Sequence, residues 1–274
     1  MMVIWAKNIN FAENNGIMEE KKRPLILISN DDGYYYDGIQ ALIGVARELG
    51  DVVVVAPQQH QSGMGSAITI SRPLRVQKLI EEPGYTAWLV DGTPTDCVKM
   101  ALDQLLDGRV PDLLLSGINH GLNTGVNTVY SGTMGAVFEG TAHHVTSVAF
   151  SYDSYETRVD FTPCLPWVRQ IIARVLEHGL PDDVCLNVNM PYCDVIHGIK
   201  VTTAGMGCWR DEYEHRVDPF GRDYYWTTGR YEMDRPDDTT TDLYNLERGW
   251  IAATPCRVDQ TAHDHLATIN ALLL

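Results

Sequence analysis

Two adjacent carboxylates, Asp31 and Asp32, come directly after an apolar run of the chain, residues 25–28. Because neighbouring like charges repel and raise each other's pKa, such a pair is retained where a cation or a shared proton compensates for the charge. The pair therefore provides candidate catalytic residues and candidate ligands of a hard cation, Mg²⁺ or Mn²⁺, since no Cys or His stands nearby at zinc spacing. The residue types at positions 30–33 are also typical of an ordinary turn, in which Asp31 caps the turn and Asp32 faces water.

Hydroxyl and imidazole groups follow two further apolar runs. Ser62 lies in a Gly-rich loop after residues 52–55. Its hydroxyl can ligate a hard cation or donate to a phosphate, although serines in such loops also form simple turns. The loop after residues 113–116 contains His120, which either contacts a substrate or supports residues that do.

The same loop ends in a predicted helix start that contains Ser131, Gly132 and Thr133. Backbone amides at a helix N-terminus, together with the two hydroxyls, would form a cradle for a phosphate group or another oxyanion. The sequence Ser-Gly-Thr is also typical of plain N-capping. The segment therefore predicts either a phosphate site or a capped helix.

The elements that position these loops alternate between strands and helices. Apolar runs predict buried strands and helical spacing predicts helices: the runs are 25–28, 52–55, 113–116 and 145–150, and the helical segments are 39–46 and 134–143. We therefore expect an α/β fold with a Rossmann-like, mostly parallel sheet flanked by helices. In such sheets ligands bind beyond the carboxyl ends of the strands, where all three loops begin.

The chain is expected to divide into three parts. Residues 1–23 have no strong pattern and are predicted to be a disordered extension, and residues 24–204 form the α/β catalytic core. Residues 205–274 comprise an extended hairpin or arm used in oligomerisation, a strand at 249–255, and a C-terminal helix at 262–273 that packs on the core. The tryptophans and tyrosines of the arm indicate an interface, although a long solvated loop is equally compatible with its composition.

The composition excludes several classes of protein. With 21 Lys and Arg against 36 Asp and Glu in 274 residues, the net charge of −15 does not suit binding to a nucleic-acid polymer. No apolar run approaches the roughly 18 residues that span a bilayer, and the first residues show no secretion signal, so we expect no membrane association. Six cysteines without a C-x-x-C pair indicate reduced thiols and a cytoplasmic location.

Several widespread catalytic motifs are absent from the sequence. The chain has no G-x-x-x-x-G-K-[ST] loop, no G-x-G-x-x-G fingerprint and no H-E-x-x-H pair. A Ser-His-Asp hydrolase that uses Ser62 or Ser131 remains an alternative, although no G-x-S-x-G elbow supports it.

Four motifs, in this order along the chain, resemble the SurE family of survival-protein nucleotidases. They are residues 27–34, residues 54–57 leading to Ser62-Gly63, residues 91–98, and residues 111–121 leading to 130–133. A weaker likeness covers residues 241–242 and 249–255. The resemblance extends over roughly residues 24–261, and four ordered motifs make coincidence improbable.

The resemblance implies a phosphatase that binds one divalent cation per subunit, Mg²⁺ or Mn²⁺, and hydrolyses nucleoside monophosphates. The resemblance implies a 5′-nucleotidase and leaves activity towards 3′-monophosphates open. It also implies assembly as a homodimer or homotetramer. Carried over by position, the implied metal ligands are Asp31, Asp32, Ser62 and Asn119, and the implied phosphate-contacting residues are Asn123, Ser131, Gly132 and Thr133. Whether water or one of the aspartates attacks phosphorus is left open.

Two stretches depart from the family pattern. Tyr36-Asp37 stands where the family usually has Ala-Pro, and residues 58–60, Gln-Gln-His, stand where Asp-Arg-Asn is common. The second change removes an arginine and so bears on contacts to the nucleoside part of a substrate. A non-catalytic protein that senses nucleotides or metal ions on the same fold is the alternative of a different class, because a fold does not determine a function.

Overall fold

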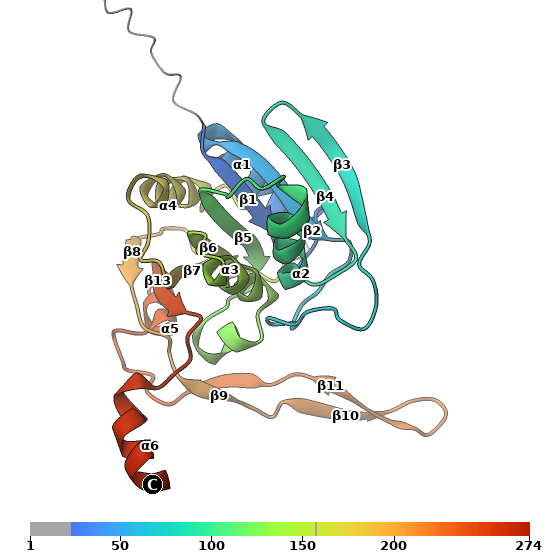
Figure 1. Ribbon diagram of the computed structural model, residues 1–274. Coiled ribbons are helices and arrows are strands. Elements are labelled where there is room, and N and C mark those ends of the chain that lie inside the picture. Colours follow the sequence, from blue (N-terminus) through green and yellow to red (C-terminus); the bar gives the residue numbers. More distant parts are fainter. Residues whose placement is uncertain (1–22, 157) are drawn as a thin grey trace, which may run out of the picture.

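The computed structural model describes residues 23–156 and 158–274, and its centre is a nine-stranded sheet (Figure 1). The strands lie in the order β3-β4-β2-β1-β5-β6-β7-β13-β8. Their bounds are Leu25–Ser29 (β1), Asp51–Pro57 (β2), Val76–Glu82 (β3), Tyr85–Val90 (β4), Leu113–His120 (β5), Ser147–Tyr152 (β6), Val184–Met190 (β7), Gly198–Val201 (β8) and Trp250–Arg257 (β13). The strands from β4 to β7 run parallel, whereas β3 and β13 are antiparallel to β4 and β7. The predicted mostly parallel sheet is confirmed.

Helices cover both faces of this sheet (Figure 1). One face carries α1 and α4, and the other carries α2 and α3. The helix bounds are Asp37–Leu49 (α1), Pro94–Met100 (α2), Gly132–Ala142 (α3), Leu165–His178 (α4), Asp242–Leu246 (α5) and Leu266–Leu273 (α6). Single helical turns occupy Ala101–Leu105 (η1), Gly125–Val129 (η2) and His263–His265 (η3).

The first strand shows why the sheet needs helices on both faces. Ile26 and Ile28 pack in the cluster that includes α1 and α4, while Leu25 and Leu27 pack in the cluster that includes α2. Because successive side chains of a strand point to opposite faces, a strand without polar residues must be buried on both. The apolar run of β1 therefore determines a three-layer arrangement.

The strand order reverses between β1 and β5. β1 pairs in parallel with β2 on one side and with β5 on the other. In open parallel sheets, the carboxyl ends of the strands at such a reversal form the crevice that binds ligands. Residues 30–33, which follow β1, and residues 117–120, at the end of β5, meet at this crevice.

Residues 207–233 form an arm that projects from the body of the molecule (Figure 1). Its strands pair as antiparallel couples, β9 with β12 and β10 with β11. Their bounds are Gly207–Arg210 (β9), Tyr213–Val217 (β10), Asp223–Thr227 (β11) and Arg230–Met233 (β12). Every residue of β10 and β11 is exposed. The chain thus forms the extended hairpin expected within residues 205–242.

The terminal helix α6 does not pack on the core, contrary to expectation. None of its residues is buried, and Leu272 and Leu273 are 76% and 74% exposed. The helix lies apart from the sheet in Figure 1. An apolar pattern identifies a helix face that favours burial, but it does not specify which surface covers that face.

The expected boundary of the N-terminal extension also shifts by one residue. Arg23 is anchored to the core, because its guanidinium donates to Asp51 Oδ1 at 3.1 Å and to the carbonyl oxygens of Arg47 and Gly50 at 2.8 Å. Residues 1–22 lie outside the described part of the chain. The expectation that they are disordered therefore stays a prediction.

The composition-based expectations about membranes and thiols can be compared with the structure. In the described ranges, no helix combines the length and the apolar character needed to cross a bilayer. All six cysteines are free thiols. Burial raises the pKa of the Cys164 and Cys185 thiols to about 12, so neither is a reactive thiolate near neutral pH.

Asp242 connects the core to the C-terminal part of the chain. It is fully buried, and its carboxylate accepts the backbone N–H groups of Gly125, Gly205 and Leu243, each at 2.8 Å. Gly125 begins η2, and Gly205 lies at the base of the arm. One side chain therefore joins the loop after β5, the arm and the start of α5.

We predict that Asp242→Ala lowers the free energy of unfolding by on the order of 3–5 kcal/mol, because three backbone N–H groups, two of them in buried hydrogen bonds, lose their acceptor. Urea denaturation of the two proteins measures the difference. Asp237→Ala is the matched control, since Asp237 is an exposed aspartate five residues before the start of α5. A loss for Asp242→Ala no larger than that of the control would contradict the prediction.

Candidate active site

Asp31 and Asp32 are buried at the carboxyl end of β1, with 4% of each residue exposed. Burial, followed by the neighbouring charge of Asp32, raises the pKa of Asp31 to about 6. Burial also raises the pKa of Asp32 above its ordinary value, although His60 and a backbone hydrogen bond from His120 act in the opposite direction. Two adjacent buried carboxylates are stable in their charged form only when a cation lies close to them, and otherwise one of them takes up a proton.

The start of α3 holds Asp31 in place. Thr133 donates its Oγ1–H to Asp31 Oδ1 at 2.7 Å. Gly132 lies against the same aspartate, where a Cβ would come within 2.8 Å of the Asp31 Cβ, so a larger residue does not fit. Ser131 caps the helix, because its Oγ accepts the N–H of Met134 at 3.1 Å. Of the four residues predicted to contact phosphate, Thr133 therefore donates its hydroxyl to a carboxylate instead.

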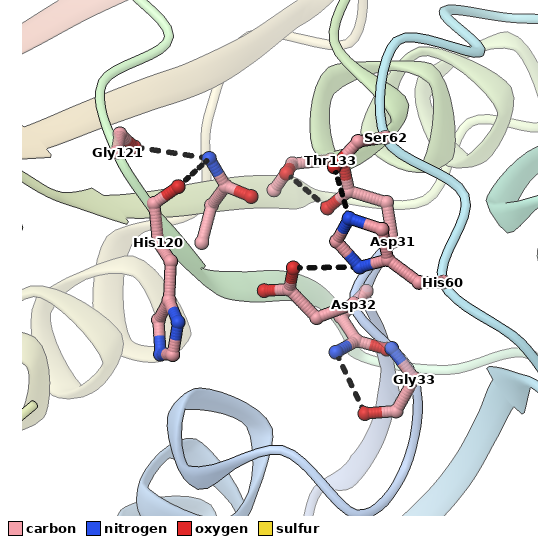
Figure 2. A network of polar contacts seen from close by, with 10 residues as sticks. Asp31, Asp32, Gly33, His60, Ser62, His120, Gly121 and Thr133 are labelled. Carbon is pink, nitrogen blue, oxygen red and sulfur yellow. Dashed lines mark hydrogen bonds and ion pairs between the residues drawn. The ribbon is translucent and has the colours of Figure 1, made fainter. Parts of the chain in front are cut away.

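His60 connects Asp32 to Ser62 (Figure 2). Its Nδ1 lies 3.3 Å from Asp32 Oδ1, and its Nε2 lies 2.7 Å from Ser62 Oγ. The imidazole also stacks on Tyr36, with ring centroids 5.8 Å apart. The sequence pattern alone assigned His60 no role, and its only signal was that residues 58–60 differ from the SurE pattern.

Asn119 lies near the end of β5, immediately after a shift in the register between β5 and β6. Such irregularities redirect side chains and are common beside active sites. Gly117 permits the shift, because its φ is +121° and a Cβ there would overlap a carbonyl oxygen of β6. The Asn119 Nδ2 donates to the carbonyl oxygens of His120 and Gly121 at 3.3 and 2.9 Å, so its Oδ1 is the atom available to a cation.

A cavity of about 160 Å³ lies among these side chains. It is lined by Asp31, Ser62, Gly63, Asn119, His120, Asn123, Asn127, Tyr130 and Ser131. The structure thus brings most of the predicted site residues together around this cavity. Asp32 is adjacent to the lining residue Asp31, and Gly132 and Thr133 contact Asp31 without lining the cavity. Drug-sized ligands fill roughly 300–1,000 Å³, so this cavity has room for a small group or for one end of a larger molecule.

A buried row of asparagines supports Asn123. Its backbone N–H donates to Asn189 Oδ1 at 2.8 Å, and its carbonyl oxygen accepts from Asn187 Nδ2 at 2.7 Å. One hydrogen of its own amide goes to Ser151 Oγ at 2.9 Å. Sequence reasoning missed Asn187 and Asn189, although two polar residues at a spacing of two in an otherwise apolar strand indicate a shared face with a polar neighbour.

The donor set fits a divalent cation. Asp32 Oδ2 is buried and has no hydrogen-bond partner in the described part of the chain. Among the same residues no three His, Cys, Asp or Glu side chains converge as a metal site. A cation would therefore rest on the carboxylates of Asp31 and Asp32 together with the neutral oxygens of Ser62 and Asn119, which suit Mg²⁺ and Mn²⁺.

Proteins of known sequence and structure are similar to this chain over most of its length. The family model described as survival protein SurE matches residues 26–211. The 5′-nucleotidase SurE of Bacteroides thetaiotaomicron is 43% identical over 251 residues, which are 92% of this chain and 96% of that protein. The 5′-nucleotidase SurE of Cytophaga hutchinsonii is 43% identical over 251 residues, with 90% and 96% covered.

A solved structure extends the similarity to three dimensions. The crystal structure of the SurE protein from Aquifex aeolicus aligns with a TM-score of 0.79 at 36% identity. The alignment covers 91% of this chain and 99% of that one. The resemblance inferred from the four sequence motifs is confirmed, and the chain belongs to the SurE family.

Proposed function

We propose that the protein is a metal-dependent phosphomonoesterase that converts nucleoside 5′-monophosphates, and also 3′-monophosphates, into nucleoside and phosphate. The observation that carries the proposal is the buried pair Asp31 and Asp32 beside a small cavity rich in oxygen and amide groups. Relatives named 5′-nucleotidase SurE support a nucleotide as the substrate. We place the protein in the cytoplasm, where its six free thiols stay reduced.

The proposed reaction is the hydrolysis of a phosphate monoester. An oxygen nucleophile forms a bond to phosphorus, the bond between phosphorus and the nucleoside oxygen breaks, and the leaving oxygen takes up the proton that the attacking water loses. A bound cation would be held by Asp31, Asp32, Ser62 Oγ and Asn119 Oδ1, and it supplies positive charge to the phosphate oxygens in the transition state. The buried carboxylates hold that charge at one fixed point beside the cavity.

The chain's own donors would orient the phosphate group. Ser131 accepts a hydrogen bond from Met134, so its hydroxyl hydrogen is free to donate into the cavity. Asn123 uses one amide hydrogen on Ser151 and keeps the second. The first backbone N–H groups of α3 point outward from a helix N-terminus, which favours an anion.

The contacts of His60 favour a second candidate function. In that candidate Ser62 attacks the substrate, His60 takes the proton of Ser62, and Asp32 orients the imidazole, as in other Ser-His-Asp enzymes. Such a hydrolase keeps its activity in the presence of a chelator and loses it in Ser62→Ala. The metal-dependent enzyme loses activity with the chelator, and a nucleotide-sensing protein shows no turnover in either condition.

For Asp31→Asn we predict at least about a hundredfold loss of phosphate release from AMP, because one of two charges that hold the cation is gone. The increase in melting temperature that Mg²⁺ or Mn²⁺ confers on the wild type should disappear as well. Asp37→Asn is the control, since Asp37 is exposed at the start of α1. Wild-type turnover and metal response in Asp31→Asn would refute the metal-site assignment.

Without metal, the same variant should be more stable than the wild type above pH 6. The pKa of Asp31 is about 6 in the fold against an ordinary value of 3.8, so the charged form destabilises the folded state and the wild type gains stability as the pH falls. The expected difference at pH 7.5 is on the order of 2–3 kcal/mol, and it should shrink towards pH 5. Urea unfolding in chelator at both pH values measures it, and equal pH dependence of the two proteins would contradict it.

We also propose that the arm, residues 207–233, makes the subunit contacts of a homodimer or homotetramer. Phe220, Tyr225 and Trp226 are 82%, 62% and 59% exposed. Large aromatic rings are unfavourable in water and are enriched at the centres of protein interfaces. Their concentration on one projecting hairpin supports an interface between copies of the chain.

Sedimentation at micromolar concentration is therefore expected to show a species larger than the 30.6 kDa chain. Replacement of residues 213–227 by a short Gly-Ser turn should reduce the mass, because β10 and β11 are removed while β9 and β12 remain. The conservative exchange Tyr225→Phe should leave the mass unchanged. A single-chain mass for the wild type would be evidence against the proposal.

A further inference from the structure

One wall of the cavity comes from residues outside the carboxylate pair and the proposed metal ligands. Asn127 lies in the turn η2 and lines the cavity together with Asp31, Tyr130 and Ser131. Asn127 is partly exposed, so its side chain is accessible to a molecule that enters the cavity. The sequence motifs assigned no role to this position.

Trp209, on the first strand of the arm, determines how the Asn127 amide is oriented. Its Nε1–H donates to Asn127 Oδ1 at 2.8 Å. Because an indole N–H can only donate, the atom that it contacts is the carbonyl oxygen of the amide, and the NH₂ group is left for another partner. Within residues 23–156 and 158–274, that NH₂ group has no hydrogen-bond acceptor.

The base of the arm is packed closely against the turn that carries Asn127. Tyr231 lies edge-on to Trp209, with ring centroids 5.8 Å apart, and its hydroxyl donates to the Gly205 carbonyl at 2.8 Å. A Cβ at Gly125 would come within 2.8 Å of the Tyr231 hydroxyl oxygen. Trp209 therefore reaches Asn127 from a support that is fixed to the core and does not involve β10 or β11.

We propose that Asn127 contacts the substrate through its side-chain NH₂ group, which donates to an oxygen of the nucleotide, and that Trp209 is its positioning residue. The identity of the ligand rests on the proposed function. An anionic group that approaches two carboxylates needs donors around it, and a free amide donor beside Asp31 meets that need. Phosphate and ribose oxygens are both acceptors of the required kind.

Asn127→Asp keeps an oxygen for Trp209 and removes the NH₂ group, but it also adds a negative charge beside the carboxylate pair, so Asn127→Ala, which adds no charge, is the deciding variant. With AMP as substrate and Mn²⁺ as the cation, we expect KM to rise about tenfold or more and kcat to stay within about twofold. Trp209→Phe, which removes the indole N–H, should raise KM about threefold. In the double variant Asn127→Ala/Trp209→Phe, KM should equal that of Asn127→Ala alone, because both changes act on one bond.

Trp226→Phe is the matched control. Trp226 is also a tryptophan of the arm, but it lies on β11, opposite Glu214 and away from the turn η2. The KM for AMP should be unchanged in this variant. Calorimetry with Mn²⁺ alone should give the same affinity, within about twofold, for Asn127→Ala, Trp209→Phe and Trp226→Phe, because none of them changes a proposed ligand or the charge of the site.

Inhibition by inorganic phosphate and by adenosine shows which part of the nucleotide accepts the hydrogen bond from Asn127. A raised inhibition constant for inorganic phosphate in Asn127→Ala assigns the bond to the phosphate group, and a raised constant for adenosine assigns it to the ribose. An unchanged KM and unchanged constants for both inhibitors would overturn the inference. A parallel loss of Mn²⁺ affinity would overturn it too, because it would show a general distortion of the site.

Failure of the proposed function is distinguishable from failure of this inference. If the wild type releases no phosphate from any monoester, the nucleotidase proposal fails, while calorimetric titration with AMP still compares Asn127→Ala with the wild type. Equal AMP affinity in that comparison refutes the contact, and weaker affinity supports it. If Trp209→Phe does not fold, Asn127→Ala still decides, since it leaves Trp209 and the charge of the site unchanged.

Discussion

The burial of two adjacent carboxylates at the end of β1 is the constraint on which the rest of the site depends. An unpaired charge taken from water into a protein interior costs several kcal/mol, and Asp31 and Asp32 are both almost fully buried. The compensating contacts are few: the Thr133 hydroxyl on Asp31, and the His60 ring and a backbone hydrogen bond from His120 on Asp32. A site of this kind needs a stable scaffold and a place for a counter-charge.

The parallel sheet provides that scaffold. β1 is buried on both faces by α1 and α2 and is flanked by β2 and β5, so the backbone that presents the two aspartates has little freedom to move. The reversal of strand order opens the crevice there, and α3 delivers Thr133 and Gly132 against Asp31. The same packing that makes the charges costly therefore also keeps them in position.

Much of this arrangement was predictable from the sequence. The apolar runs before Asp31 and before Asn119 predict parallel strands, and the rule for their carboxyl ends places both loops at one edge of the sheet. The hairpin β3–β4 and the helix α2 were not predicted, although the capping box of Thr93 and Asp96 marks the start of that helix. His60, Asn127 and Asn187 were also not predicted, since each acts through a neighbour that is distant in the sequence or across a loop.

The sequence by itself determined the buried strands, the acidic pair and the family, because side-chain periodicity and short motifs are local properties of the chain. Only the tertiary structure decided that Thr133 bonds Asp31, that His60 lies between Asp32 and Ser62, and that Trp209 orients Asn127. It also decided that α6 leaves the core. These contacts join segments up to 102 residues apart, as in the pair Asp31 and Thr133, and their geometry depends on how helices and strands pack. No local pattern encodes a packing distance of that kind.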